Sequence, residues 1–148
     1  MKKIEPLPGF IDADRLGVNP EKVCHVIVKA RTFDAKDGVV DSGSGSNAAD
    51  DGMRDILEDF AGDATAQELV AFIRSLDEEE QVNLVALAWL GRGTYEPSEW
   101  DEAVNEARRA HNKRTAEYLV GLPLLGDYLE EGLAAFGANC DAFEMGRL

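Results

Sequence analysis

The chain has 148 residues, 45% of them hydrophobic, and its 29 acidic against 15 basic side chains give a formal net charge of -14. A chain of this size buries roughly 70% of its unfolded surface and forms one globular domain without a disulfide framework. Its longest apolar run, residues 84–90, is far shorter than the roughly 20 residues of a membrane-spanning helix, which excludes a transmembrane class. The negative charge also disfavours nucleic acids and anionic membranes as partners.

The cysteines and the N-terminus indicate the compartment. Cys24 and Cys140 lie far apart without CxxC spacing, which is typical of free thiols in a reducing cytosol, although a disulfide between them stays open. Two lysines follow the first methionine, but neither the apolar stretch nor the cleavage site of a secretory signal comes after them. We therefore expect a cytoplasmic protein.

The first elements are an arm and a helix. Residues 1–18 lack a sustained period and predict an N-terminal arm that lies on the domain. Asn19-Pro20-Glu21 then supplies an N-cap residue, a proline at the first helical position and an acid in the first turn. This pattern predicts the first helix over residues 19–35. The β-branched run at residues 26–28 leaves a strand as the alternative.

A loop rich in glycine, serine and aspartate follows at residues 36–51, where these residues occur at a density typical of a flexible linker. Beyond it, residues 52–137 predict a helical core that opens on a short helix at residues 53–60. Residues 138–148 have too little periodicity for more than a C-terminal tail.

Two helices with capping signals come next in the core. Thr65 and Glu68 have the spacing of a capping box, which predicts a helix beginning there. Asp77 and Glu80 repeat that spacing at the start of the segment 78–90. The second half of this segment is apolar on every face, as in a helix enclosed by its neighbours. We expect it to be the central helix.

The remaining core is predicted as a turn and two helices. The sequence Gly91-Arg92-Gly93 predicts a sharp turn with Gly91 as the helix C-cap. The longest helix then begins at Pro97 or Ser98 and runs to about Val120, with an apolar stripe suited to packing along one neighbour. Residues 121–123 end it, because the proline there cannot continue the helix. The last helix closes at Gly137.

The fold class follows from these elements. Residues 52–137 contain no alternating strand pattern of useful length and have short connections between the last four helices. The sequence therefore predicts an all-α, single-domain, orthogonal or bundle-like array of five to six helices. Gly126 and Gly132 lie inside the last helix at a cost of about 1 kcal/mol each, which indicates a close helix approach or the floor of a cleft.

Several short motifs resemble a known family. They are LVALAWLGRG at residues 84–93, Glu99-Trp100, and the segments at residues 115–119, 121–125 and 127–133. In this order they are similar to a bacterial domain family catalogued as being of unknown function, over about residues 76–137. The resemblance implies a cytosolic bacterial helical protein and brings no activity, cofactor or catalytic residue with it.

No motif for catalysis or metal binding is present in the sequence. Histidine occurs only at His25 and His111, outside any zinc-binding spacing. Residues 93–100 have the second half of an EF-hand loop, but its first half would need carboxylates where the chain has Ala88, Leu90 and Arg92. We also find no nucleophile paired with a base and no phosphate-binding loop. The sequence predicts no catalytic residue, no metal and no cofactor.

Seven residues are the candidates for contact with a ligand or partner. They are Arg92, Gly93, Trp100, Arg108, His111, Arg114 and Tyr118. The guanidinium of Arg92, which lies between two glycines, could bind a carboxylate or phosphate of a ligand, or it could form an ion pair with a nearby acid of the chain. The basic cluster in the second half of the long helix could dock an anion, or it could be a solvated face that complements the helix dipole. His111 could be a pocket residue or a neutral core histidine.

Two functions follow as hypotheses. The first is a non-catalytic protein-interaction or regulatory module, with a protein partner or self-association through Arg92, Trp100 and the basic helix face. The second is a small-molecule protein or enzyme with a pocket between the long and last helices, in which His111, Tyr118 and two arginines would bind an anionic ligand. A pocket of several hundred Å³ that holds His111 and an arginine would favour the second function.

Overall fold

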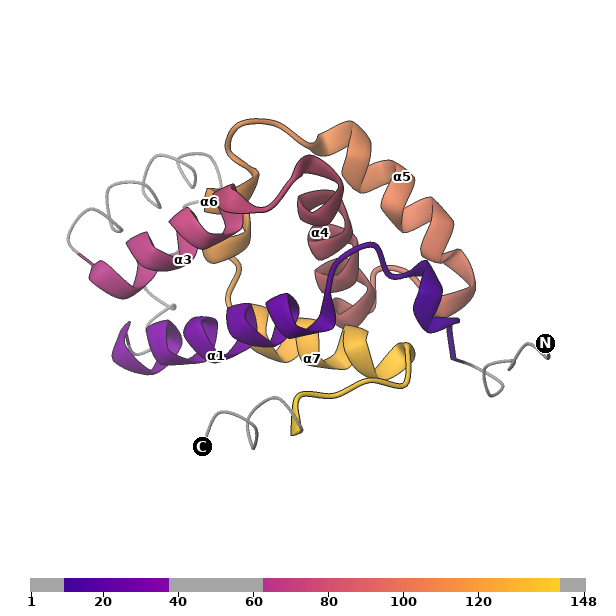
Figure 1. Cartoon of the computed structure of the whole chain (residues 1–148), viewed down its shortest axis with the longest axis horizontal. Helices are drawn as coiled ribbons and strands as arrows, with labels where there is room; N and C mark the ends of the chain where they lie inside the picture. The colour runs from indigo at the N-terminus through magenta and orange to yellow at the C-terminus, as the bar shows by residue number, and fades with distance from the viewer. Residues whose placement is uncertain (1–9, 38–62, 142–148) are drawn as a thin grey trace.

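The computed structural model describes residues 10–37 and 63–141 (Figure 1). Within these residues it is helical and contains no strand, which confirms the predicted all-α array. The elements are η1 (Ala13–Arg15), α1 (Pro20–Asp37), α3 (Ala64–Ser75), α4 (Glu78–Arg92), η3 (Pro97–Glu99), α5 (Trp100–Ala110), α6 (Thr115–Val120) and α7 (Leu125–Ala135). Among them is no helix of the length and apolarity that a bilayer crossing requires. The predicted short helix at 53–60 and residues 38–51 of the predicted loop lie outside the described residues.

Helix α4 lies at the centre of the array, with α5 on one side and α7 beneath it (Figure 1). Its capping box is present as predicted: Asp77 Oδ1 accepts from the amide of Glu80 at 2.8 Å, and Glu80 Oε1 accepts from the amide of Asp77 at 3.2 Å. All residues from Val82 to Ala88 are buried, and so is Leu90. The segment that is apolar on every face is therefore the core helix.

Two helix ends differ from the prediction. The N-cap of α3 is Asp63, whose carboxylate accepts from the amide of Ala66 at 3.0 Å, so Thr65 lies inside the first turn. The C-cap of α4 is Gly93, with a left-handed φ of 94°, and Gly91 lies within the helix. A glycine is required at position 91 by the packing of the two helices, because a Cβ there would overlap the carbonyl oxygen of Tyr128 in α7.

Glycines set the distance between α4 and α7, the two helices with the most extensive contact. Gly91 of α4 meets the backbone of α7, and Gly132 of α7 meets the backbone of α4. A Cβ at Gly132 would lie 2.6 Å from the carbonyl oxygen of Leu87. Of the two roles predicted for Gly132, the structure shows the close helix approach.

Helix α1 excludes the strand alternative and packs across α7. Asn19 caps it, with its Oδ1 accepting from the amide of Glu21 at 2.7 Å. On its outer side Arg31 donates to Glu130 at 2.5 Å and to Asp127 at 2.8 Å. The hydrogen bond to Glu130, followed by the one to Asp127, raises the pKa of the Arg31 guanidinium above its ordinary value.

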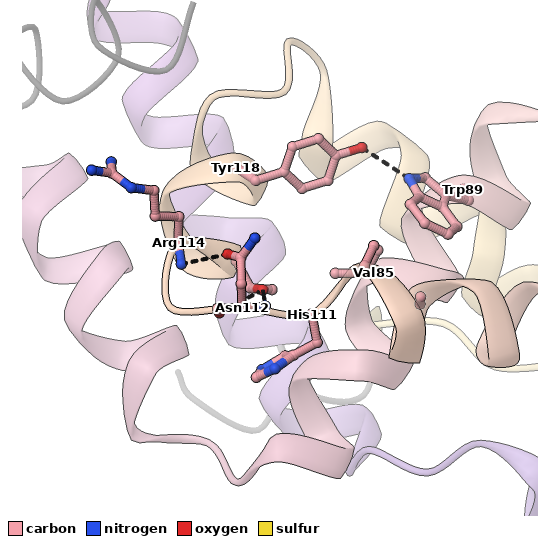
Figure 2. A pocket seen from close by; sticks show the side chains of 9 residues that line it. Val85, Trp89, His111, Asn112, Arg114 and Tyr118 are labelled. Carbon is pink, nitrogen blue, oxygen red and sulfur yellow. Dashed lines mark hydrogen bonds between the residues drawn. The ribbon is translucent and has the colours of Figure 1, made fainter.

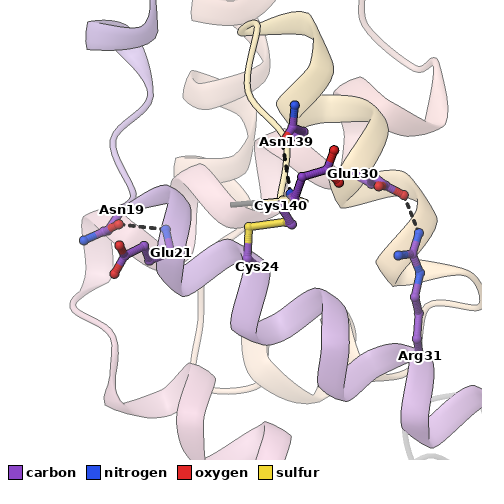
Figure 3. The surroundings of a disulfide bond; sticks show 8 residues. Asn19, Glu21, Cys24, Arg31, Glu130, Asn139 and Cys140 are labelled. Carbon is purple, nitrogen blue, oxygen red and sulfur yellow. Dashed lines mark hydrogen bonds and ion pairs between the residues drawn. A yellow bond between two sulfur atoms is a disulfide. The ribbon is translucent and has the colours of Figure 1, made fainter. Parts of the chain in front are cut away.

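The expectation of free thiols is wrong, because Cys24 and Cys140 form a disulfide. Figure 3 shows the bond between α1 and the segment that follows α7. The Cα atoms are 5.7 Å apart, and both side chains are buried. Their separation of 116 residues in sequence gave no signal of this pairing, which the packing of α1 on α7 brings about.

The predicted helix from Pro97 to Val120 is also corrected. It is three elements: the 3-10 turn η3, then α5, then the short α6 after a break at residues 111–114. The backbone of His111 is extended, with a ψ of 136°. Asn112 and Thr115 compete for the backbone hydrogen bonds of the helix at this point.

Replacing Gly132 with alanine tests the contact between α4 and α7. We expect the free energy of unfolding to fall by about 1–3 kcal/mol, because the added methyl group meets the backbone of α4. This loss outweighs the gain of about 1 kcal/mol in helix propensity. Urea unfolding measures the change. The control is Gly126→Ala, where the added methyl group would lie 3.0 Å from the side chain of Arg31 and 3.2 Å from the carbonyl oxygen of Ile27, a milder overlap that should cost less. A Gly132→Ala variant as stable as the native chain, or more stable, would contradict the packing.

The disulfide predicts a sensitivity to reductant. The double variant Cys24→Ala, Cys140→Ala should be less stable than the native chain by about 2–4 kcal/mol, because its unfolded state is no longer cross-linked. Thermal unfolding with and without dithiothreitol measures this. Reductant should lower the melting temperature of the native chain and leave that of the variant unchanged. A native chain that melts at the same temperature in both buffers would show that the bond is absent.

Candidate functional site

The site begins at the break between α5 and α6. Asn112 Oδ1 accepts from the amide of Arg114 at 2.7 Å. The hydroxyl of Thr115 accepts from the amide of Asn112 at 3.0 Å and donates to the carbonyl of Asn112, also at 3.0 Å. These bonds satisfy the backbone where the helix stops, so the chain turns between two helices without exposing unpaired buried groups.

His111 anchors this break to α4. Its Nε2 lies 2.8 Å from Oε1 of Gln81. Because the Gln81 amide nitrogen donates to the carbonyls of Ile73 and Leu76 at 3.0 and 3.1 Å, its oxygen must accept, and His111 therefore carries a proton on Nε2. The side chain is only 19% exposed, and Nδ1 lies 3.9 Å from Glu78. His111 thus holds the break against α4 through a hydrogen bond, and its partly buried side chain also lines the pocket described below.

An aromatic pair forms the opposite wall. Trp89 of α4 donates its indole N–H to the hydroxyl of Tyr118 in α6 at 2.9 Å (Figure 2). On its other side Trp89 stacks on Tyr95, with ring centroids 6.1 Å apart. The bond fixes the indole, and it leaves the phenol proton of Tyr118 without an acceptor among the described residues.

A pocket of about 230 Å³ lies between these walls (Figure 2). Residues of α4, α5, the break and α6 line it: Val85, Trp89, Ala107, Ala110, His111, Asn112, Arg114, Thr115 and Tyr118. A cavity of roughly 150 Å³ binds benzene, and pockets for drug-sized ligands begin near about 300 Å³. This pocket therefore fits one ring or one branched alkyl group with a short substituent.

A second, open groove adjoins the pocket. It is lined by Arg74 of α3 together with Asn112, Lys113, Arg114 and Glu117, so it shares Asn112 and Arg114 with the pocket. The guanidinium of Arg114 points away from Tyr118 and Trp89 in Figure 2, which places this charge at the rim. Lys113 and Arg114 have no carboxylate partner within the described part of the chain.

The structure brings together three of the seven candidate residues, namely His111, Arg114 and Tyr118, which all line the pocket. The pocket is not between the long and last helices as expected, because the long helix breaks and its second piece turns to face α4. No residue of α7 lines it.

The other four candidates lie elsewhere. Trp100 is 1% exposed, donates its indole N–H to the carbonyl of Arg15 at 3.2 Å and packs edge-on against Phe136, so it is a core residue. Arg108 pairs with Glu79 at 2.6 Å. Arg92 donates to the hydroxyl of Thr94 at 3.0 Å rather than to an acid, and Gly93 is the open helix cap.

Sequence reasoning missed several lining residues. Val85 and Trp89 were hidden in a segment that is buried on nearly all sides. The signal for Asn112 and Thr115 was present, because Asn and Thr three residues apart often bond the backbone at a helix end. Arg74 and Glu117 are 43 residues apart, and only the packing of α3 against α6 brings them together.

Residues 66–138 match the model of a family described as "Protein of unknown function (DUF3775)". This segment, which is just under half of the chain, is similar to that family, and it contains every residue that lines the pocket. The resemblance to a domain family without an assigned function is thereby confirmed. No curated protein and no solved structure matches the chain.

Removing the hydroxyl of Tyr118 tests the wall of the pocket. Tyr118→Phe should lower the free energy of unfolding by about 1 kcal/mol, because the half-buried indole N–H of Trp89 loses its acceptor. Urea unfolding gives the energy, and the NMR shift of the Trp89 indole N–H reports the lost bond. Tyr95→Phe is the control, since Tyr95 contacts Trp89 through its ring. The same loss in both variants would contradict the assignment.

Proposed function

We propose that this protein binds a small molecule that carries one apolar group and one anionic group. The observation that carries the proposal is the pocket of about 230 Å³ at the break between α5 and α6, adjoining two cations without a partner among the described residues. Of the two functions predicted from the sequence, this geometry favours small-molecule binding.

The apolar group of the ligand belongs between Trp89, Tyr118 and Val85. The two aromatic rings offer flat apolar surface, and their hydrogen bond holds them in place before a ligand arrives. A wall that needs no reordering keeps the entropic cost of binding low. The alanines at 107 and 110 leave the space that the ligand would fill.

The anionic group belongs at Lys113 and Arg114. Seven other described cations each pair with a carboxylate: Arg15, Lys22, Lys29, Arg31, Arg74, Arg108 and Arg109. Arg92 has no carboxylate partner either, but it bonds the hydroxyl of Thr94 and lines neither the pocket nor the groove. Lys113 and Arg114 are therefore the described cations beside the pocket that no carboxylate pairs with, in a chain with a net charge of -14. They are therefore the natural point of attraction for an external carboxylate or phosphate.

The protein-interaction function is less well supported. Its aromatic anchor was Trp100, which lies in the core. Self-association, a protein partner and a cytoplasmic location stay predictions. The disulfide weighs against the last of these, since such bonds persist mainly in oxidising compartments.

The test uses 3-phenylpropionate and 4-methylpentanoate as probes, each an apolar group joined to a carboxylate. We expect either probe to shift the indole N–H resonance of Trp89 and to leave that of Trp100 unchanged, because only Trp89 lines the pocket. Heteronuclear NMR titration measures both resonances at once. If neither probe moves the Trp89 resonance at millimolar concentration, the proposed function is overturned.

Variants separate the pocket from its rim. Ala110→Phe should weaken probe binding about tenfold or more by filling the pocket, a loss of about 1.4 kcal/mol. The matched control Ala134→Phe, on the exposed side of α7, should bind as the native chain does. Arg114→Gln should weaken binding about threefold, as expected for one exposed charge, and the paired Arg108 should tolerate the same change. Unaltered binding by Ala110→Phe would place the probe elsewhere.

A further inference from the structure

From the buried carboxylate beside the groove we infer that the ligand is a zwitterion, an α-amino acid with an apolar side chain. This inference rests on the proposed function and extends it. Its carboxylate would meet Lys113 and Arg114, its side chain would enter the pocket, and its ammonium group would meet Glu117.

Glu117 is a half-satisfied buried acid. It lies in α6 and is only 4% exposed. Its Oε2 pairs with the guanidinium of Arg74. Its Oε1 is buried and has no hydrogen-bond partner in the described part of the chain. A buried carboxylate oxygen without a donor costs free energy, so this atom has capacity for one more donor.

The groove leads to the side chain of Glu117. Glu117 and Arg74 both line it, and the side chain of Arg74 is 56% exposed. In the proposal, this exposed side chain turns aside when the ligand binds, and the ammonium group then meets Oε1. An ammonium group suits the unpaired Oε1, because it brings three N–H donors and a positive charge.

The groove and the pocket share Asn112 and Arg114 in their linings, so they are neighbours on the surface. In the proposal, one ligand spans both. A simple carboxylate would be attracted by Lys113 and Arg114 but would leave Oε1 of Glu117 without a hydrogen-bond donor. A simple amine would donate a hydrogen bond to Glu117 but would be repelled by the two cations. Only a molecule with both charges next to an apolar group complements the whole surface.

The test compares ligands that differ by one group, on the native chain. L-phenylalanine is paired with 3-phenylpropionate, which lacks the amine, and with phenethylamine, which lacks the carboxylate. L-leucine is paired with 4-methylpentanoate in the same way. Titration of the Trp89 indole N–H resonance gives each Kd. We expect at least one amino acid to bind about tenfold tighter than its deaminated partner, the value of one charge-assisted hydrogen bond.

The variant Glu117→Gln identifies the contact. It should abolish the advantage of the amino acid over its deaminated partner, while the deaminated acid binds as well as before or better. Glu131→Gln, an exposed residue of α7, is the matched control and should keep the advantage. Circular dichroism verifies that both variants are folded, and the comparison on the native chain remains decisive if Glu117→Gln is not.

The outcomes separate the two proposals. If the deaminated acids shift Trp89 and neither amino acid binds more tightly, the zwitterion is wrong and the proposed function stands. If neither class shifts Trp89, both fail. An advantage that persists in Glu117→Gln would also overturn the assignment of the ammonium group to this carboxylate.

Discussion

The close contact of α4 with α7 is the constraint on which the rest of the structure depends. Gly91 and Gly132 let the two backbones touch, and a Cβ at either position would push them apart. Because α4 is buried on nearly all sides, its position fixes those of its neighbours. One side of α4 packs on α7, and Val85 and Trp89 lie on a different side, which faces α5 and α6.

The break between α5 and α6 forms the pocket. A continuous helix would carry residues 111–118 straight on, away from α4. The bonds of Asn112 and Thr115 stop the helix, and the bond of His111 to Gln81 holds the stop against α4. Helix α6 then returns with Tyr118 over Trp89. A few polar side chains that satisfy local backbone thus determine the shape of an apolar space.

The helices were largely predictable, because periodicity and capping are local. Asn19 and the pair Asp77 and Glu80 cap the helices that the sequence assigned to them. Features that depend on other elements were not predictable. The sequence predicts Gly91 as a helix end, whereas in the structure it lies inside α4 where that helix contacts α7. The same holds for the candidate site. His111, Arg114 and Tyr118 were predictable together because they lay on one predicted helix. Glu117 was not, because its role depends on the ion pair with Arg74 of α3.

The disulfide has a topological consequence. Because its two cysteines are separated by 116 residues in sequence, it closes most of the polypeptide into one covalent ring that includes α3 to α7. A single cut of the main chain anywhere inside that ring opens the circle without releasing a fragment. Proteolysis would therefore produce a nicked species of nearly unchanged mass, and two pieces would separate only after the sulfur link is broken.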